Sequence, residues 1–234
     1  MRVGIIQSNY IPWRGYFDFI DEVDLFILHD DLQYTKGDWR NRNRIKTPRG
    51  SIWLTVPVHY RETHQRICDT EIDYSRNWQK DHENQIRANY GGAPYLEDVF
   101  NLLLPAFSYR DRTISQLNRR LIESISRYLN IATPLRDAAE YSVTGQKTDR
   151  IIALCKCVGA ATYLSGPNAK SYLDEPALRR EGIALEYKNY EYPPYPQQGA
   201  GFEGRVTILD LIANCGPASY GHLKCRSPES FSKA

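Results

Sequence analysis

The sequence lacks the long apolar run and the leader-like N-terminus that would place a chain in or across a membrane. No apolar stretch approaches the roughly 18 residues that a membrane-spanning helix needs. The first residues also lack the basic-then-apolar layout of a signal peptide. We therefore expect a cytoplasmic protein that makes no membrane contact.

An excess of charge of either sign is also missing. The 30 basic and 28 acidic side chains leave a formal net charge of +2, which excludes attraction of a polyanion to the whole surface. A local basic patch is compatible with this balance. Charged residues make up 25% of the chain and hydrophobic residues 41%, which argues against disorder and predicts a folded domain.

Metal-binding and redox motifs are absent as well. The five cysteines contain no CxxC pair, and Cys155 and Cys157 stand as CxC in an apolar run that we expect to be helical. This spacing favours neither structural zinc nor a disulfide framework. The five histidines form no HExxH or H-x₃-H pattern, and no Walker loop, GxGxxG or nucleophile elbow occurs. We predict no metal site.

Tyrosine is the residue type in excess, with 17 Tyr against 7 Phe and one Met. A tyrosine offers an apolar ring and a polar hydroxyl. Such side chains suit the walls of sugar and nucleotide pockets, while partly buried core is the alternative for most of them.

The first 30 residues predict a strand, a helix and a second strand. Residues 2–8 and 25–28 are short apolar runs, and residues 15–23 carry apolar side chains at helical spacing. This βαβ opening predicts an α/β fold with a Rossmann-like parallel sheet, whose ligands lie beyond the carboxyl ends of the strands. The candidate site residues at these two strand ends are Gln7, Asn9, Tyr10, His29, Asp30, Asp31 and Gln33.

The rest of the chain completes a single domain over about residues 1–220, with a helical block in mid-chain at about 76–130. We expect a strand at 51–58, a further strand at 67–72, helices at 77–89, 96–107, 113–129, 147–158 and 176–181, strands at 161–164 and 184–187, and a terminal helix from 206. Residues 190–204 hold three Pro and predict an ordered loop or a lid. We expect residues 221–234 to form a frayed tail.

The densest cluster of polar residues is a basic loop at 35–49. Lys36 to Arg49 contains six cations and one acid, and asparagines alternate with arginines. In an extended segment the arginines would lie on one side and the asparagines on the other. We favour a loop that binds phosphate over a solvated loop, and nucleic acid is the least favoured partner. The candidate substrate-binding residues here are Tyr34, Trp39, Arg40, Asn41, Arg42, Asn43 and Lys46.

Asp30 and Asp31 are the candidate catalytic carboxylates, with His29 beside them. Adjacent residues on an extended chain point in opposite directions, so we expect one of the two to enter the site. That one would act as a general base or bind a ribose or an amine, with Mg²⁺ binding as a less favoured role, or it would simply pair with Arg40 or Arg42. The turn at Ser165 and Gly166, with Lys170 after it, offers a second place where backbone donors meet an anion, and a plain turn is the alternative.

Several longer motifs resemble the WbqC-like family of bacterial proteins. They are GIIQSNYIPWRGYFD, DDLQYTKGDWRNRNRIKT, the WLTVPV strand, the YLSGP turn and the late NCGP, and they span nearly the whole chain to about residue 217. The genes of this family are associated with surface polysaccharide and O-antigen biosynthesis, often beside enzymes that make amino sugars. The resemblance therefore implies a pathway more directly than a reaction.

The opening is also similar to that of the HUP-type nucleotidyltransferases and the tRNA cytidine acetate ligases. In those proteins a strand leads into an HxGH-like turn that handles nucleotide phosphates. The matching stretch here runs from Trp13 to Tyr16, keeps the glycine and lacks both histidines. The likeness implies a HUP-type scaffold in which Arg40 to Lys46 would supply the phosphate contacts, with Trp13 and Tyr16 as further substrate-binding candidates.

Together these features lead to an enzyme that forms an amide on a nucleotide-linked amino sugar, as an N-acyl or aminoacyl transferase or ligase. The acyl donor would be an acyl-CoA or an acid activated by ATP. Two alternatives stay open, a non-catalytic module that binds nucleotide sugars and a nucleotidyltransferase-like or RNA-modifying enzyme. The sequence also leaves open whether two copies form a homodimer.

Overall fold

A computed structural model describes residues 1–224 and 231–233, and it is built around a six-stranded sheet with the order β5-β2-β1-β6-β7-β8. All pairs are parallel except the last, in which β8 runs antiparallel to β7. The strands are β1 (Arg2–Ile6), β2 (Leu25–Leu28), β5 (Leu135–Asp137), β6 (Thr162–Ser165), β7 (Ala184–Lys188) and β8 (Phe231–Lys233). The predicted α/β class with a parallel sheet is confirmed, and the strand order is consistent with a Rossmann-like arrangement.

Both faces of the sheet are covered, because alternate residues of its strands enter two separate apolar cores. In β2, Phe26 and Leu28 belong to one core, while Leu25 and Ile27 belong to the other. Continuous apolar runs of this kind are typical of parallel strands that are buried on both sides. Gly4 in β1 faces the first core, where a Cβ atom would lie 2.3 Å from the ring of Phe19, so the missing side chain lets α1 approach the sheet.

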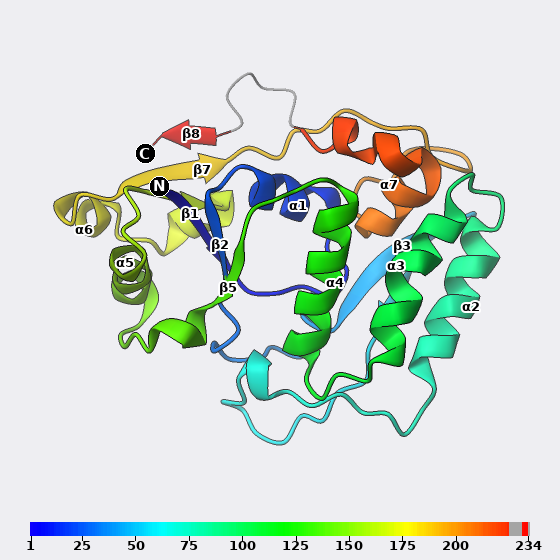
Figure 1. Ribbon diagram of the computed structural model, residues 1–234, viewed down its shortest axis with the longest axis horizontal. Coiled ribbons are helices and arrows are strands. Elements are labelled where there is room, and N and C mark those ends of the chain that lie inside the picture. Colours follow the sequence, from blue (N-terminus) through cyan, green and yellow to red (C-terminus); the bar gives the residue numbers. More distant parts are fainter. Residues whose placement is uncertain (225–230, 234) are drawn as a thin grey trace.

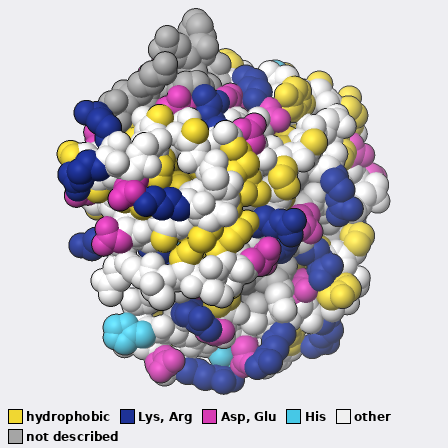
Figure 2. Space-filling model, turned by 60° about the vertical axis from the view of Figure 1, so that its left-hand side comes forward, with side chains coloured by type: hydrophobic (Ala, Val, Ile, Leu, Met, Phe, Trp, Pro, Cys, Tyr) yellow, Lys and Arg dark blue, Asp and Glu magenta, His cyan; other side chains and the backbone are white. Residues whose placement is uncertain are grey.

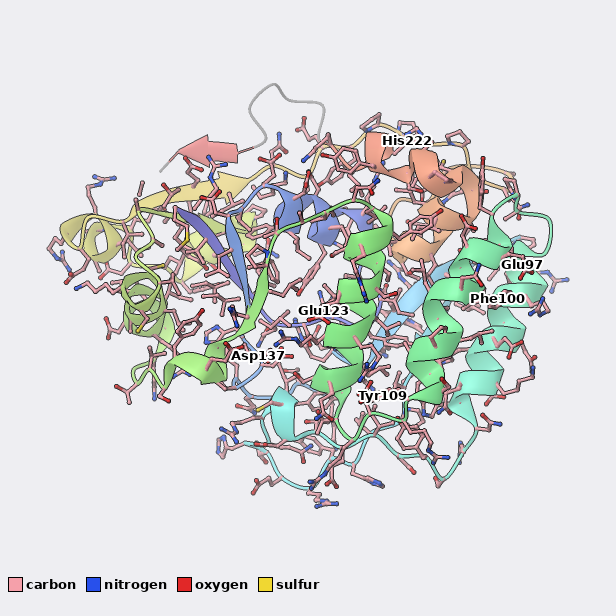
Figure 3. All side chains as sticks on the ribbon, viewed as in Figure 1. Glu97, Phe100, Tyr109, Glu123, Asp137 and His222 are labelled. Carbon is pink, nitrogen blue, oxygen red and sulfur yellow. The ribbon has the colours of Figure 1, made fainter. Side chains whose placement is uncertain are left out.

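The helices form two layers on opposite sides of the sheet (Figure 1). The smaller core holds α5 (Lys147–Cys157) and α6 (Glu175–Arg180). The larger core holds α1 (Arg14–Asp21), α2 (Trp78–Tyr90), α3 (Leu96–Ser108), α4 (Ile114–Tyr128) and α7 (Ile208–Cys215). The expected helical block in mid-chain is therefore present as α2, α3 and α4. Arg119 on α4 binds both Glu123 and Asp137, which ties the block to β5 (Figure 3).

The basic loop expected at 35–49 is in part a strand. Arg42–Thr47 forms β3, which pairs antiparallel with β4 (Gly50–Thr55) in a separate two-stranded sheet. Ile45 is the one apolar residue of this strand, so the segment gave little strand signal, yet Ile45 and Asn43 are buried and fix the register. As expected for an extended segment, Arg42 and Arg44 lie on the face opposite Asn43.

The prediction of a strand at 67–72 is wrong. Residues Ile67–Asp69 form a 3₁₀ helix, because Thr70 folds back and donates from Oγ1 to the carbonyl of Arg66 at 2.8 Å. Only isolated bridges remain there, including one between Val58 and Ile72.

The expected tail is in part folded. A 3₁₀ helix covers Gly216–His222, and β8 adds a strand at the edge of the sheet, whereas residues 225–230 and 234 lie outside the described part of the chain. The segment 190–204 is an ordered loop. Tyr192 donates to Asp18 at 2.7 Å and Tyr195 donates to Asp210 at 2.7 Å, so the loop is held to α1 and α7.

A fully buried ion pair joins the sheet to α1. The ammonium group of Lys188 at the end of β7 lies 2.6 Å from a carboxylate oxygen of Asp18, and both side chains have no exposed surface. The hydroxyl of Tyr192 donates to the same oxygen. Removing one partner of such a pair leaves an uncompensated charge in a medium of low dielectric constant.

We therefore expect Lys188→Met to lower the free energy of unfolding by about 3 kcal/mol, because Asp18 would lose its nearer cation and keep only the ammonium group of Lys224, 3.6 Å from its other carboxylate oxygen. Urea denaturation of the full chain measures this. The matched control is Lys156→Met, which breaks the exposed pair with Glu181 and should cost less than about 1 kcal/mol. Equal losses in the two variants would contradict a stabilising role for the buried pair.

Candidate functional site

A cavity of about 1040 Å³ opens at the carboxyl ends of β1, β2 and β6. The chain leaves β1 for β2 on one side, while β6 pairs with the other side of β1. The strand order therefore reverses beside β1, and ligands of open parallel sheets bind at such a switch point. The described residues that line the cavity include Gln7, His29, Asp31, Arg40, Arg66, Lys147, Arg150, Tyr163, Ser165, Gly166, Asn168 and Tyr172.

The wall of this cavity is positively charged. It carries the cations Arg40, Arg66, Lys147 and Arg150 against a single carboxylate, Asp31. The first turn of α5 also faces the space, and the free N–H groups of a helix N-terminus favour anions. The chemistry of the wall therefore suits an anionic ligand.

His29, Asp31 and Arg150 form one contact network inside the cavity. The guanidinium group of Arg150 donates from Nε to Nε2 of His29 at 3.1 Å and from Nη2 to Oδ2 of Asp31. Because arginine only donates, Nε2 of His29 must accept and the ring proton resides on Nδ1. Oδ1 of Asp31 is buried and has no hydrogen-bond partner among the described residues.

Burial, the largest cause, lowers the pKa of His29, Asp31 opposes the shift and the Arg150 guanidinium adds to it, and together they bring the pKa from its ordinary value of 6.5 to about 4. The imidazole is therefore neutral at pH 7. It acts there as a fixed dipole between Arg150 and the cavity and not as a cation.

Asp30 points away from the cavity and has a structural role in this arrangement. One carboxylate oxygen accepts from the backbone N–H of Ser8 at 2.7 Å and the other from Oγ of Ser115 at 2.5 Å. The two aspartates thus diverge, as expected for adjacent residues on an extended chain, and Asp31 is the one at the cavity.

Arg40 reaches the cavity from the segment before β3. Its guanidinium donates to the carbonyl of Ser8 at 3.1 Å and lies 3.4 Å from Asp38, while its own carbonyl accepts from Asn118. Ser165 and Gly166 line the opposite wall at the end of β6. Lys170 lies outside, with its ammonium group 4.7 Å from the ring centre of Tyr187.

Other candidates from the basic loop lie elsewhere and hold the backbone. Asn41 donates to the carbonyl of Val56 at 2.8 Å, and Asn43 donates to the carbonyl of Ile11 at 2.8 Å. The ammonium group of Lys46 binds Gln197 and the carbonyl of Gly201. Arg42 and Trp39 lie on the outer face of the β3–β4 hairpin.

The remaining aromatic and amide candidates also pack within the structure. Tyr10 and Tyr34 are buried, Tyr16 donates to the carbonyl of Gln7, and Gln33 donates to the carbonyl of Thr63. Trp13 contacts Tyr190 with 5.3 Å between ring centroids. Asn9 keeps a buried Oδ1 atom without a partner among the described residues.

Of the cavity residues named above, the candidates from the sequence did not include Arg66, Lys147, Arg150, Tyr163, Asn168 and Tyr172. A usable signal existed for Lys147 and Arg150, because the start of α5 follows β5 and the carboxyl end of every parallel strand meets the same edge of the sheet. Arg66 had no such signal, since it directly precedes the segment 67–72, for which the sequence predicts a strand.

The described residues bring together no three His, Cys, Asp or Glu side chains that could hold a metal ion. None of the helices described is long and apolar enough to cross a bilayer. On the face that is turned forward in Figure 2, Lys and Arg side chains are interspersed with Asp and Glu. The concentration of positive charge is thus a property of the cavity and not of that surface.

Comparison with known proteins places this geometry in a family. The WbqC-like protein family matches residues 7–221. A curated relative from Mycobacterium tuberculosis, "Uncharacterized protein Rv1507c", is 44% identical over 229 residues, which cover 96% of this chain and 99% of that protein. No solved structure matches the chain. The family match begins directly after β1 and covers most of the chain, and the relative is similar over nearly its whole length, so the chain belongs to the WbqC-like protein family.

Proposed function

We propose that the chain is an enzyme of bacterial surface polysaccharide (O-antigen) biosynthesis that forms an amide on the amino group of a nucleotide-linked sugar. The observation that carries the proposal is the cavity at the switch point, where four cations and one carboxylate face the same space. A diphosphate needs cations and an amino group needs an acceptor for its N–H bonds, and this wall offers both.

The diphosphate would bind between Arg66, Lys147 and the first turn of α5. Arg66 and Lys147 are the exposed cations of the wall, and Arg66 would exchange its ion pair with the exposed Asp69 for the incoming anion. Arg40 is half-buried and fixed by Ser8, which suits a positioning contact deeper in the cavity. Charge-assisted hydrogen bonds from these groups would orient the nucleotide sugar.

The amino group of the sugar would bind Asp31. Its Oδ1 atom is buried without a donor among the described residues, and an unpaired acceptor of this kind costs free energy until a donor arrives. Arg150 already holds the other carboxylate oxygen, so Asp31 is fixed in orientation before the ligand binds.

The chemical step is nucleophilic attack of the amine on an acyl carbonyl carbon. The nitrogen forms the new C–N bond, the carbonyl electron pair moves to oxygen, and the adduct expels the thiolate of an acyl-CoA or the phosphate group of an acid activated by ATP. The nitrogen becomes acidic as the bond forms, so the carboxylate of Asp31 suffices to take its proton. The neutral His29 is a weak base at pH 7 and keeps Arg150 in place.

The base and sugar would contact the rim of the cavity. Tyr172 lies there with 60% of its surface exposed, which leaves a ring face free for stacking. Gln7 and Asn168 offer amide groups for hydroxyls.

The first test of the proposal is binding of uridine diphosphate to the full chain by calorimetry. Arg66→Gln and Lys147→Gln should each weaken binding about tenfold, because each removes one charge-assisted hydrogen bond. Arg61→Gln is the matched control, since Arg61 is also exposed and paired with an acid but does not line the cavity. Equal losses in Arg61→Gln would show that only the general field of the surface matters.

The second test addresses catalysis. Asp31→Asn should reduce amide formation on an amino-sugar nucleotide by a factor on the order of 100 to 10,000, while the affinity for uridine diphosphate changes little. Product is measured by mass spectrometry with an acyl-CoA, or with ATP and the free acid. If the unmodified protein binds the sugar nucleotide but gives no product with either donor, the chain is a non-catalytic binding module.

A third test uses pH. The folded chain binds a proton at His29 only near pH 4, whereas the unfolded chain binds it near 6.5, so the free energy of unfolding should fall as the pH drops from 6.5 to 4. His29→Asn should remove up to about 3 kcal/mol of this loss in urea denaturation. The exposed His64 provides the control, and His64→Asn should leave the profile unchanged. A profile that is identical in all three proteins would overturn the assignment of a neutral His29.

A further inference from the structure

A second hollow, with a volume of about 700 Å³, lies between β4 and the start of α2. None of its described lining residues is shared with the cavity at the sheet edge, so it is a separate site. In Figure 1 the hairpin passes behind α3, next to α2 and away from α5. We call this hollow the hairpin groove, and its lining residues are Ile52, Trp53, Leu54, Thr55, Pro57, Arg76, Trp78, Asp81, His82, Asn84 and Gln85.

Trp53 lines the hairpin groove, and a second exposed tryptophan, Trp39, packs beside it. Trp53 is 43% exposed and Trp39 is 39% exposed, and their ring centroids lie 5.2 Å apart. Indoles are costly to leave in water, so a pair of them side by side on an outer face indicates a binding surface.

Two arginines extend the indole surface. The guanidinium carbon of Arg42 lies 4.1 Å from the ring centre of Trp53, and that of Arg44 lies 5.5 Å from it. Arg44 has no ion pair with any described residue, and its buried Nε atom has no hydrogen-bond partner there. The stacking holds these cations in place without neutralising them.

The opposite wall is polar. Asp81, Asn84 and Gln85 are exposed and lie three and four residues apart on α2, so they share one face of the helix. Trp78 is only 3% exposed, yet its indole N–H has no hydrogen-bond partner among the described residues. A carboxylate, two amides and an unpaired N–H together supply donors and acceptors on one side of a narrow space.

We propose that the hairpin groove binds an acidic oligosaccharide, separately from the nucleotide-sugar cavity. The faces of pyranose rings are apolar C–H surfaces that stack on indoles, while their hydroxyls suit Asp81, Asn84 and Gln85. The carboxylates of uronic acid residues match the unneutralised cations Arg42, Arg44 and Arg76.

The lining favours a saccharide over single-stranded nucleic acid. A nucleic-acid groove follows the phosphate backbone with cations, whereas the lining residues that α2 contributes here include the carboxylate of Asp81 and no Lys or Arg. The side-chain amides of Asn84 and Gln85 beside it both donate and accept hydrogen bonds, which suits sugar hydroxyls better than a chain of phosphates. The lining also has too many polar groups for an apolar peptide helix.

The test is a titration of the full chain with a tetrasaccharide of galacturonic acid, neutral maltotetraose and a thymidine tetranucleotide, followed by tryptophan fluorescence and calorimetry. We expect the acidic tetrasaccharide to bind best. Trp53→Ala should weaken its binding about tenfold, because the stacking surface is lost. Arg44→Gln should weaken the acidic tetrasaccharide several-fold and leave maltotetraose unchanged.

Tyr109→Ala is the matched control, since Tyr109 is an exposed ring under the guanidinium of Arg120 at the end of α3 and does not line the groove (Figure 3). This variant should bind all probes as the unmodified chain does. Trp53→Ala should keep its affinity for uridine diphosphate, which separates the groove from the cavity. Preference for the tetranucleotide, absence of saccharide binding at millimolar concentration, or equal losses in Tyr109→Ala would overturn the proposal.

Discussion

The buried carboxylate of Asp30 joins three parts of the chain that lie far apart in the sequence. It binds the backbone of Ser8 after β1 and the hydroxyl of Ser115 at the start of α4, while its own carbonyl accepts from the N–H of Cys68. Asn118, one turn further along α4, then holds both Ser8 and the carbonyl of Arg40. The helical block is thereby fixed to the strand ends, and the wall of the cavity depends on this attachment.

The division of labour between the two aspartates follows from that constraint. Adjacent residues at a strand end point to opposite faces of the sheet. Asp30 points into the interior of the fold, where its carboxylate accepts a hydrogen bond from the backbone N–H of Ser8. Asp31 is left at the cavity side, where Arg150 orients it and His29 fills the space beside it. The same residues that make the site rigid also leave a single carboxylate oxygen free for a ligand.

The sequence supported the α/β class, the helical block and the strand ends at Gln7 and Asp31, because these rest on local apolar patterns and on one rule about parallel sheets. It did not reveal Arg66 or Arg150, which approach the cavity only through tertiary packing. The basic loop shows this limit most clearly. In one short stretch, Arg40 lines the cavity and Arg42 lies on an outer face. The side chains of Asn41 and Asn43 donate to backbone carbonyl groups. The alternation of arginine and asparagine predicted that the two residue types lie on opposite sides of the strand, but the composition did not indicate which part of the protein each side contacts.

The place of the helical block in the chain has a consequence for how the protein folds. Strand β2 finds its outer neighbour β5 only after the hairpin and three helices have been synthesised, since all of them lie between the two strands in the sequence. On a ribosome, β1, α1 and β2 emerge long before that partner exists, and the open edge of β2 stays available to other chains in the meantime. Contacts among α2, α3 and α4 join neighbouring segments, so this block is able to form while the edge of β2 is still open and before β5 emerges to cover it.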